Sequence, residues 1–532
     1  MESVNGEIKD SLVKARSYVL EGGEQILRGG LDEAHRLSIS PGATALAALT
    51  QLLLGNQFKK SHQAGLAWLR QNRCPQGWSK VPNGESDPEI TRLVQKVLLG
   101  SYSGKMAKYF LPGQANELAN IVLALGQQVV AGMEGPQPQE TKLPYILSDH
   151  VLNKLPPYGR PVVIAASLLA VKNLDQFGAS QAAAYLCDHQ LEDGSWCEDV
   201  VATSLSALAL VRARVSGEQI IKAGKWLQSK QYPRGGWPAF DQLQIWSTGL
   251  TIYTFVEFSQ SPEERDFLNR AAKWLADAQY SDGSYGSTPP FTQPDLDDTA
   301  VALLGLQLFN RVSSDQAAET LRRLQNKDGS WSTFPNYDGV PPALNCMFPV
   351  YIRSTDVTIH ALDALIGMPG NNGSLAVSLG LRWLLSQQLP SGEIPAVWYE
   401  SPVYATAQAL ELLNKWVNQV NPRGISQYFY NVQNKLFQYL VSSQNTDGSW
   451  GASVIETSLA LSALSLHYHR LPPATLAKGV SYILSRQAAN GSFQPSYQGV
   501  YAKGWNYEEP LTTALTAIKA MERYNLLTDK GQ

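Results

Sequence analysis

The sequence predicts an all-α protein built from two α/α barrels, and two observations carry this prediction. One turn pattern recurs along the chain: a glutamine, a glycine-containing turn, and an aromatic residue six positions after the glutamine. The segments between the turns alternate between amphipathic helices and helices that are apolar on nearly every face. A closed ring buries both kinds, because the apolar helices line its inside and the amphipathic ones cover its outside.

The recurring turns are interpreted as braces of the barrels rather than as sites of chemistry. Glycine permits the tight turn, the glutamine can bond the exposed backbone ends of neighbouring helices, and the aromatic can pack on the next helix. The copies pair Gln190 with Trp196, Gln231 with Trp237, Gln279 with Tyr285, Gln325 with Trp331, Gln444 with Trp450 and Gln487 with Phe493; looser copies run from Gln71 to Trp78 and from Gln388 to a longer turn ending near Trp398.

Length and composition fit a large globular protein. A chain of 532 residues favours two domains. Its hydrophobic content of 44% and formal charge of −3 give no support for a nucleic-acid surface. The four cysteines form no zinc-binding pair and no disulfide framework. The acidic start does not resemble a signal peptide, and the longest apolar stretch, residues 162–171, is too short to span a bilayer. We therefore expect a cytoplasmic protein.

Three aspartates in four residues stand out: Asp295, Asp297 and Asp298 precede the apolar segment that begins at Thr299. One interpretation is helix capping, since carboxylates are favoured at helix starts. However, crowding carboxylates at the mouth of a dry core raises the pKa of at least one of them. A carboxylic acid that stays protonated at neutral pH can donate a proton. The run therefore favours general-acid chemistry.

A second segment is in register with the acidic run. Aligning Thr358 with Thr299 places Asp356 opposite Asp297, and His360 follows Asp356 by four residues on the same helical face. His360 could hydrogen-bond the acid and fix which oxygen carries the proton. The alternative is a histidine satisfied within the core.

These residues resemble the class II terpene cyclases, which include squalene–hopene cyclases and bacterial diterpene cyclases. The run from Asp295 to Ala300 resembles their Asp-x-Asp-Asp acid motif, and the turns resemble their QW repeats. The resemblance implies two α-helical barrels, β and γ, with the active site between them. It implies an N-terminal β-domain helix in residues 1–25, an inserted γ domain in 26–254 and the rest of the β domain in 255–532.

The resemblance also implies roles for single residues. Asp297 would be the general acid, with Asp295 and Asp298 shaping its protonation. Asp356 and His360 match the segment that orients the acid in squalene–hopene cyclases, and Tyr404 resembles a tyrosine near that acid.

A diphosphate substrate is expected because the chain length resembles that of bacterial diterpene cyclases. Asp193 and Glu198 match the spacing of an acidic motif associated there with Mg²⁺, which suits hard oxygen ligands, although Asp193 also belongs to a repeat turn. Arg353 and Lys503 are candidate diphosphate cations, or else solvated surface residues. The sequence has no Asp-Asp-x-x-Asp motif, so the diphosphate should remain attached.

The expected reaction is protonation-initiated cyclisation of geranylgeranyl diphosphate to a bicyclic diphosphate of copalyl, kolavenyl or halimadienyl type. A downstream class I synthase or phosphatase would then use the product. The alternatives are farnesyl diphosphate as substrate, a squalene–hopene-type triterpene cyclase, and a non-catalytic α/α-barrel binding protein. Aromatic residues near the acid are expected to line the pocket, with core packing as their alternative role: Tyr285, Trp331, Phe334 and Tyr337.

Overall fold

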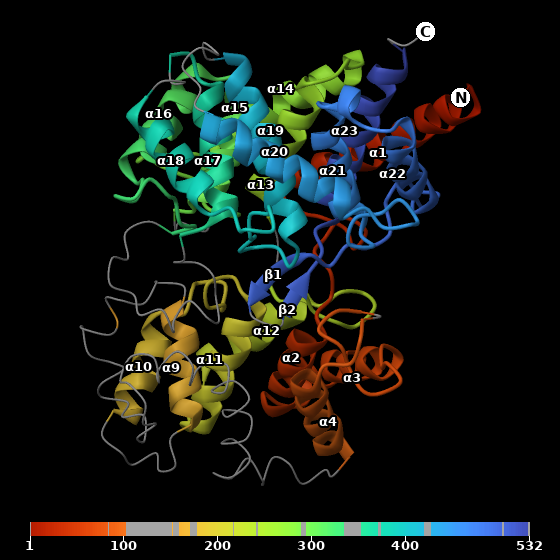
Figure 1. The fold of residues 1–532 in the computed structure, drawn as a ribbon. Helices are drawn as coiled ribbons and strands as arrows, with labels where there is room; N and C mark the ends of the chain where they lie inside the picture. Colours follow the sequence, from red (N-terminus) through yellow and green to blue (C-terminus); the bar gives the residue numbers. More distant parts are fainter. Residues whose placement is uncertain are drawn as a thin grey trace.

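The computed structural model covers most of the chain and consists almost entirely of helices. It describes residues 2–82, 84–102, 152, 159–170, 178–215, 217–240, 243–288, 294–334, 353–370, 374–419, 427–502 and 505–529. Figure 1 shows two lobes, with the green-to-blue C-terminal part of the chain in one and the orange-to-yellow part in the other. The all-α prediction is confirmed.

The C-terminal lobe is a double ring of helices. Among its described helices, each inner one packs on the next, and the last packs back on the first. The inner ring consists of α13 (Gln244–Val256), α15 (Leu296–Leu306), α17 (Thr355–Gly367), α19 (Pro402–Gln419), α21 (Val454–Ser465) and α23 (Pro510–Asp529). The outer helices are α14 (Pro262–Asp277), α16 (Arg311–Arg323), α18 (Leu375–Ser386), α20 (Gln427–Ser442), α22 (Pro473–Ser485) and the N-terminal α1 (Glu2–Leu27). A short 3₁₀ turn, η4 (Tyr468–Arg470), precedes α22.

Helix α1 is far from its lobe in sequence but packs within it. It contacts α13, α14, α22 and α23, and Figure 1 shows it as the red helix inside the green-to-blue lobe. Its apolar face, including Ile8 and Val19, is fully buried. The N-terminal helix therefore completes the outer ring between α22 and α14.

The second lobe repeats the inner-and-outer arrangement. Helices α2 and α11 pack on each other, α4 and α9 continue from them, and α3, α10 and α12 cover the outside. The described helices of this lobe are α2 (Pro41–Leu53), η1 (Asn56–Phe58), α3 (Lys59–Gln71), α4 (Pro88–Tyr102), α9 (Gly159–Ala170), α10 (Ala179–Asp188), α11 (Val200–Arg212) and α12 (Glu218–Lys230).

Two hydrophobic cores correspond to the two lobes. One contains residues between 8 and 26 and between 245 and 521, and the other contains residues between 39 and 239 together with Tyr501. Helix α13 belongs to the first core, so the cores divide between Phe240 and Gln244, slightly before the expected boundary at residue 255. The domain limits themselves remain a prediction.

A β-hairpin connects the lobes. Strands β1 (Gly499–Ala502) and β2 (Trp505–Tyr507) pair antiparallel, and Figure 1 shows them between the two helical bodies. Tyr501 stacks on Phe240, with ring centroids 5.2 Å apart, and its hydroxyl donates to the Asp199 carboxylate. The hairpin therefore links the C-terminal chain to the other lobe.

Each repeat turn is hydrogen-bonded to two neighbouring helices. Gln325 Nε2 donates to the carbonyl oxygens of Gly329 at 2.8 Å and Ala376 at 2.9 Å, which joins the turn to the start of α18. The backbone N–H of the buried Trp331 donates to Thr358 Oγ1 at 2.9 Å on the next inner helix. Equivalent glutamine bonds recur at Gln190, Gln231, Gln279, Gln388, Gln444 and Gln487.

The turn after Gln388 differs from the prediction. It has the standard length, and the buried Ile394 takes the aromatic position, since its N–H donates to Thr406 Oγ1 at 3.0 Å. The longer turn ending at Trp398 was inferred because no aromatic stands six residues after the glutamine. Trp398 belongs instead to the candidate site.

None of the described helices combines enough length with enough hydrophobicity to cross a bilayer.

Candidate active site

The candidate site lies where the inner helices of the C-terminal lobe begin, facing the other lobe. Asp295 is the N-cap of α15, and its Oδ1 accepts from the N–H groups of Asp297 at 2.8 Å and Asp298 at 3.3 Å. Burial and the nearby Asp297 charge raise the pKa of Asp295 to about 8. Asp295 therefore caps the helix, and the crowding also makes its carboxyl hard to ionise.

Asp298 is more deeply buried than Asp297. It is 4% exposed, and its Oδ1 has no hydrogen-bond partner among the described residues. Burial, together with the charges of Asp295 and Asp297, raises the pKa of Asp298 well above its ordinary value. The Asp297 side chain is 18% exposed and reaches the cavity wall.

His360 on α17 holds Asp297. Its Nδ1 lies 2.6 Å from Asp297 Oδ1, and its Nε2 lies 2.8 Å from Gln408 Oε1 on α19. An amide oxygen only accepts, so Nε2 carries a proton. Burial opposes the charged form, but the Asp297 carboxylate raises the pKa of His360 above its ordinary value. A charged imidazolium would donate to both partners at once.

Asp356 bonds the backbone of the cavity wall. The sequence pairs Asp356 with His360 as an orienting couple, and Asp356 Oδ2 accepts from the backbone N–H groups of Val397 and Trp398, both at 2.7 Å. Its Oδ1 has no hydrogen-bond partner among the described residues, and its charge contributes to the raised pKa of His360. Burial raises the pKa of Asp356 to about 6, because two backbone donors do not fully replace water. Asp356 therefore fixes a wall of the cavity.

Tyr404 lies beside the histidine, as its resemblance to the family tyrosine suggested. It is 3% exposed, and its ring stacks on Tyr399 with an interplanar angle of 10°. Its hydroxyl oxygen is 3.5 Å from His360 Nε2, which is long for a hydrogen bond. Tyr404 thus packs against the imidazole that holds the acid.

The cavity in front of Asp297 is largely aromatic and draws on both lobes. Aromatic faces attract cations, and a wall of such side chains also keeps water out. Phe334 is the only one of the expected aromatic liners that the described residues place on this wall. The aromatic side chains on the wall are Phe240, Trp246, Phe334, Trp398, Tyr399, Tyr501 and Tyr507.

Two expected pocket residues belong to the core instead. Tyr285 and Trp331 are fully buried among the barrel helices and are not part of the cavity wall. Both occupy the aromatic position of a repeat turn, where the backbone N–H bonds the threonine of the next inner helix. Because these residues are close in sequence to the acid run, the sequence predicts that they line the pocket. The geometry of the repeat turns instead directs their rings into the core of the lobe.

The predicted magnesium pair is not brought together. Asp193 is exposed, and its Oδ1 accepts from Ser195 N–H at 2.9 Å and Ser195 Oγ at 2.7 Å. Asp328 and Asp447 make the same bonds in their repeat turns. Glu198 lies on the cavity wall and Asp193 does not. Asp193 therefore serves the turn, and Glu198 is the member of the predicted pair that lies on the cavity wall.

Among the described residues, no group of three or more histidine, cysteine, aspartate or glutamate side chains is arranged to hold a metal ion.

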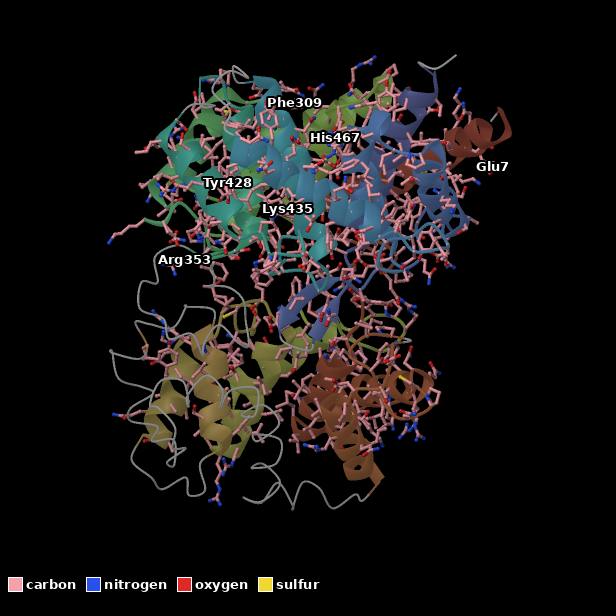
Figure 2. All side chains as sticks on the ribbon, viewed as in Figure 1. Glu7, Phe309, Arg353, Tyr428, Lys435 and His467 are labelled. Atoms are coloured by element: carbon pink, nitrogen blue, oxygen red, sulfur yellow. The ribbon has the colours of Figure 1, made fainter. Side chains whose placement is uncertain are left out.

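The expected diphosphate cations receive no direct support. Figure 2 shows Arg353 at the margin of the C-terminal lobe. It forms an ion pair with Asp328 and is not among the residues of the cavity wall. Lys503 and the expected liner Tyr337 lie outside the described residues.

Several residues of the site were missed by sequence reasoning, although a signal for one of them was present. Gln408 follows Thr406 by two positions, as His360 follows Thr358, and both threonines bond the backbone of a repeat turn. Extending the threonine alignment to α19 would have found Gln408 next to the histidine. Trp246, Tyr501 and the rest of the hairpin carry no comparable pattern.

Comparison with known proteins supports a family assignment. Residues 289–458 match the squalene-hopene cyclase C-terminal domain, a stretch that includes Asp297 and His360. The chain is 24% identical to a drimenyl diphosphate synthase from Streptomyces showdoensis over 57% of this chain and 55% of that protein. It is 28% identical to a copalyl diphosphate synthase from Streptomyces anulatus over 43% of this chain and 37% of that protein. The chain is therefore similar to terpene cyclases over part of its length.

The fold is also similar to that of a solved structure. The structure of ent-copalyl diphosphate synthase from Streptomyces platensis matches 97% of this chain and 99% of that one, with a TM-score of 0.60 at 16% identity. The sequence alignments are shorter and span about half or less of the curated relatives' lengths. The similarity in fold therefore extends over nearly the whole chain.

Proposed function

We propose that the chain is a class II cyclase in which Asp297 protonates the terminal alkene of a prenyl diphosphate. The observation that carries the proposal is the chain of contacts from Gln408 through His360 to Asp297, which ends at an aromatic cavity. Both buried carboxyls beside Asp297 have raised pKa values. A capping motif alone does not require this arrangement.

The histidine decides which oxygen of Asp297 donates. If His360 is an imidazolium, its Nδ1–H occupies Asp297 Oδ1, and the acidic proton must then reside on Oδ2. That proton is free to face the substrate, and the positive charge beside it makes the carboxyl a stronger acid. Gln408 keeps the imidazole in this orientation by accepting from Nε2.

Ring closure follows from the cation that protonation creates. The proton adds to the alkene carbon nearer the chain, and the tertiary cation forms at the carbon that bears the two methyl groups. The next double bond attacks it, and the charge moves along the substrate as rings close. Tyr399, Trp398 and Phe334 would stabilise this charge with their π faces and exclude water that could capture it early.

Geranylgeranyl diphosphate is the proposed substrate, and a bicyclic copalyl-, kolavenyl- or halimadienyl-type diphosphate is the proposed product. The relatives named copalyl diphosphate synthase support this choice. The drimenyl diphosphate synthases support farnesyl diphosphate as the second candidate. In both cases the diphosphate stays attached, so a class I synthase or a phosphatase would have to consume the product.

Dependence on Mg²⁺ remains part of the proposal as a prediction. Glu198 is the member of the predicted pair that lies on the cavity wall, and an oxygen ligand there would suit Mg²⁺ near a diphosphate. Asp193 is left out of this role because its carboxylate bonds Ser195.

A substrate panel tests the proposal. The protein is incubated with geranylgeranyl diphosphate, farnesyl diphosphate and squalene, each with and without Mg²⁺, and products are identified by mass spectrometry after phosphatase treatment. We expect a bicyclic alcohol from geranylgeranyl diphosphate, formed faster with Mg²⁺, and no turnover by Asp297→Asn. Cyclisation of squalene alone would point to a triterpene cyclase. Binding of all three without turnover would point to a non-catalytic barrel.

A further inference from the structure

A reaction that starts with a proton from Asp297 and ends in an alkene must return a proton to the protein. The acceptor has to be a group other than the donor that also reaches the cavity, because the positive charge moves along the substrate as rings close. Outside the acid run, the described cavity wall carries three carboxylates: Glu198, Asp199 and Glu509.

Asp199 is occupied by structural bonds. It is the N-cap of α11, with Oδ1 accepting from Ala202 N–H at 2.7 Å, and its Oδ2 accepts from the Tyr501 hydroxyl of the hairpin. Asp199 therefore joins the hairpin to the other lobe, whereas the bonds of Glu509 lie within the C-terminal lobe. Glu198 takes a left-handed backbone conformation with φ of 53° just before this cap. Glu198 is also the residue proposed above as an oxygen ligand for Mg²⁺ near the diphosphate.

Glu509 has an unusual position at the start of α23. It directly precedes Pro510, the first residue of the helix, and its Oε2 accepts from Thr512 N–H as a cap does. Ser, Thr, Asp and Asn are the favoured capping residues, and glutamate is not among them. Five other inner helices are capped by short side chains, Ser40, Asp199, Asp295, Ser354 and Ser453, and the N-cap of α13, Leu243, makes no side-chain bond. Glutamate at this one position brings a longer carboxylate to the cavity wall.

The start of α13 places Glu509 beside the acid machinery. The Trp246 backbone N–H lies within hydrogen-bonding reach of the Asp298 carboxyl, and the Trp246 ring packs edge-on against His360 with centroids 5.2 Å apart. The next residue, Ser247, donates from Oγ to Glu509 Oε1 at 3.0 Å. Trp246 and Ser247, which are adjacent on α13, therefore contact His360 and Glu509, respectively. The Trp246 ring also lies on the cavity wall.

We propose that Glu509 accepts the proton that ends the cyclisation, an inference that rests on the proposed function. The C–H bond next to the final cation breaks, its electron pair becomes the new C=C bond, and the proton passes to a Glu509 oxygen. Asp297 has lost one proton and Glu509 has gained one, so the reaction is an isomerisation. Each carboxylate oxygen has two lone pairs, so both can keep their present hydrogen bonds.

The environment of Glu509 fits a base that works near neutral pH. Its residue is 9% exposed, and burial raises the pKa of its carboxyl above the ordinary value despite the bonds from Thr512 and Ser247. A raised pKa makes the carboxylate a stronger proton acceptor.

The test is Glu509→Gln, assayed on the substrate that the wild-type protein consumes. The amide oxygen can still accept from Thr512 N–H, so the cap is kept while the base is lost. We expect substrate to be consumed at a rate within about tenfold of wild type. The main alkene should be replaced by hydroxylated, water-captured products and alkene isomers. An unchanged alkene as the main product would overturn the proposal.

Two further variants separate this role from capping and from general damage. Glu508→Gln is the matched control, because Glu508 is also buried but lines a different cavity, so its products should equal those of wild type. A product change of the same kind in Glu508→Gln would overturn the proposal. Ser247→Ala removes the bond to Oε1 without touching the cap and should shift the products in the same direction but less far. If Glu509→Gln fails to fold by circular dichroism, unchanged products in Ser247→Ala would overturn the proposal.

The control reaction also separates this proposal from the function beneath it. Absence of turnover by the wild-type protein on every prenyl substrate would contradict the proposed function. Turnover by the wild type with unchanged products in Glu509→Gln would contradict only the assignment of the base.

Discussion

The buried carboxylates at the two ends of the C-terminal barrel have pKa values that are shifted in opposite directions. Asp356 and Asp363 lie two turns apart on the same helix, α17. Burial raises the pKa of Asp356 to about 6, and its bonds come only from backbone N–H groups. Burial acts on Asp363 as well, but Lys415 Nζ lies 2.5 Å from its Oδ1, and the pKa of Asp363 is lowered. The cation, and not the degree of burial, decides the protonation state.

The same contrast holds for the neighbouring helix. Glu411 on α19 contacts Lys519 at 2.7 Å and Arg523 at 3.0 Å. These two cations outweigh burial and bring the pKa of Glu411 to about 2. At the mouth of the barrel, the only cation-forming partner described for Asp297 is His360. The barrel therefore has one end with ionised carboxylates that stabilise the fold and another end with carboxyls that can carry protons.

The largest expected effect is loss of activity in Asp297→Asn. We expect turnover to fall by about 10³-fold or more, because Asp297 is the cavity acid that His360 contacts and orients. The melting temperature should stay close to that of wild type, since asparagine can still accept from His360. Initial rates and a thermal melt check both parts. Wild-type turnover in this variant would contradict the assignment.

His360 should show a smaller effect that depends on the replacement. His360→Phe removes the donor to Asp297 and should lower kcat by about 100-fold. His360→Asn places an amide N–H near the position of Nδ1 and should recover part of the rate. Equal loss in both variants would mean that the histidine contributes packing and not orientation of the acid.

Asp363→Asn tests the opposite end of the same helix. It leaves Lys415 without a charged partner and should destabilise the fold by about 2 kcal/mol, measured by denaturant unfolding. The rate per folded molecule should remain near that of wild type. If Asp363→Asn lost rate while its stability stayed unchanged, the conclusion that carboxylates at this end stabilise the fold would be wrong.

The smallest effect concerns the pH dependence of stability. The pKa of Asp295 is raised from 3.8 to about 8, so the folded state prefers the neutral acid and loses stability as pH rises through this window. Asp295→Asn keeps a capping oxygen and removes the titration. We expect the variant to gain about 1–2 kcal/mol over wild type at pH 8 to 9, and nothing near pH 4. Unfolding curves at several pH values measure the difference, and a constant difference across pH would contradict it.

Much of the site could be predicted because the barrel repeats itself. Thr299 and Thr358 hold equivalent turns, so one alignment places Asp297 and Asp356 at the same level of the ring. Tyr404 was expected from its resemblance to the family tyrosine, and Thr406 shows that its helix follows the same pattern. The order of inner and outer helices followed from periodicity alone. The repeats therefore predicted which residues meet, although not which atoms bond, as Asp356 illustrates.

Other features could not be predicted, because they depend on contacts between distant segments. Trp398 and the hairpin residue Tyr501 reach the cavity through irregular backbone that has no helical period. Tyr285 and Trp331 were placed in the pocket from their distance along the chain, whereas the direction of the turn decides where their rings point. Such contacts require the folded structure.

The most direct test of proton-initiated chemistry is turnover in D₂O. The Asp297 carboxyl exchanges its proton with solvent, so a reaction that it starts must place one deuterium on the substrate. We predict a product with a single deuterium, located by NMR at the ring methylene next to the carbon that bears the two methyl groups, and no such product from Asp297→Asn. A cyclised product without deuterium at this carbon would contradict the account.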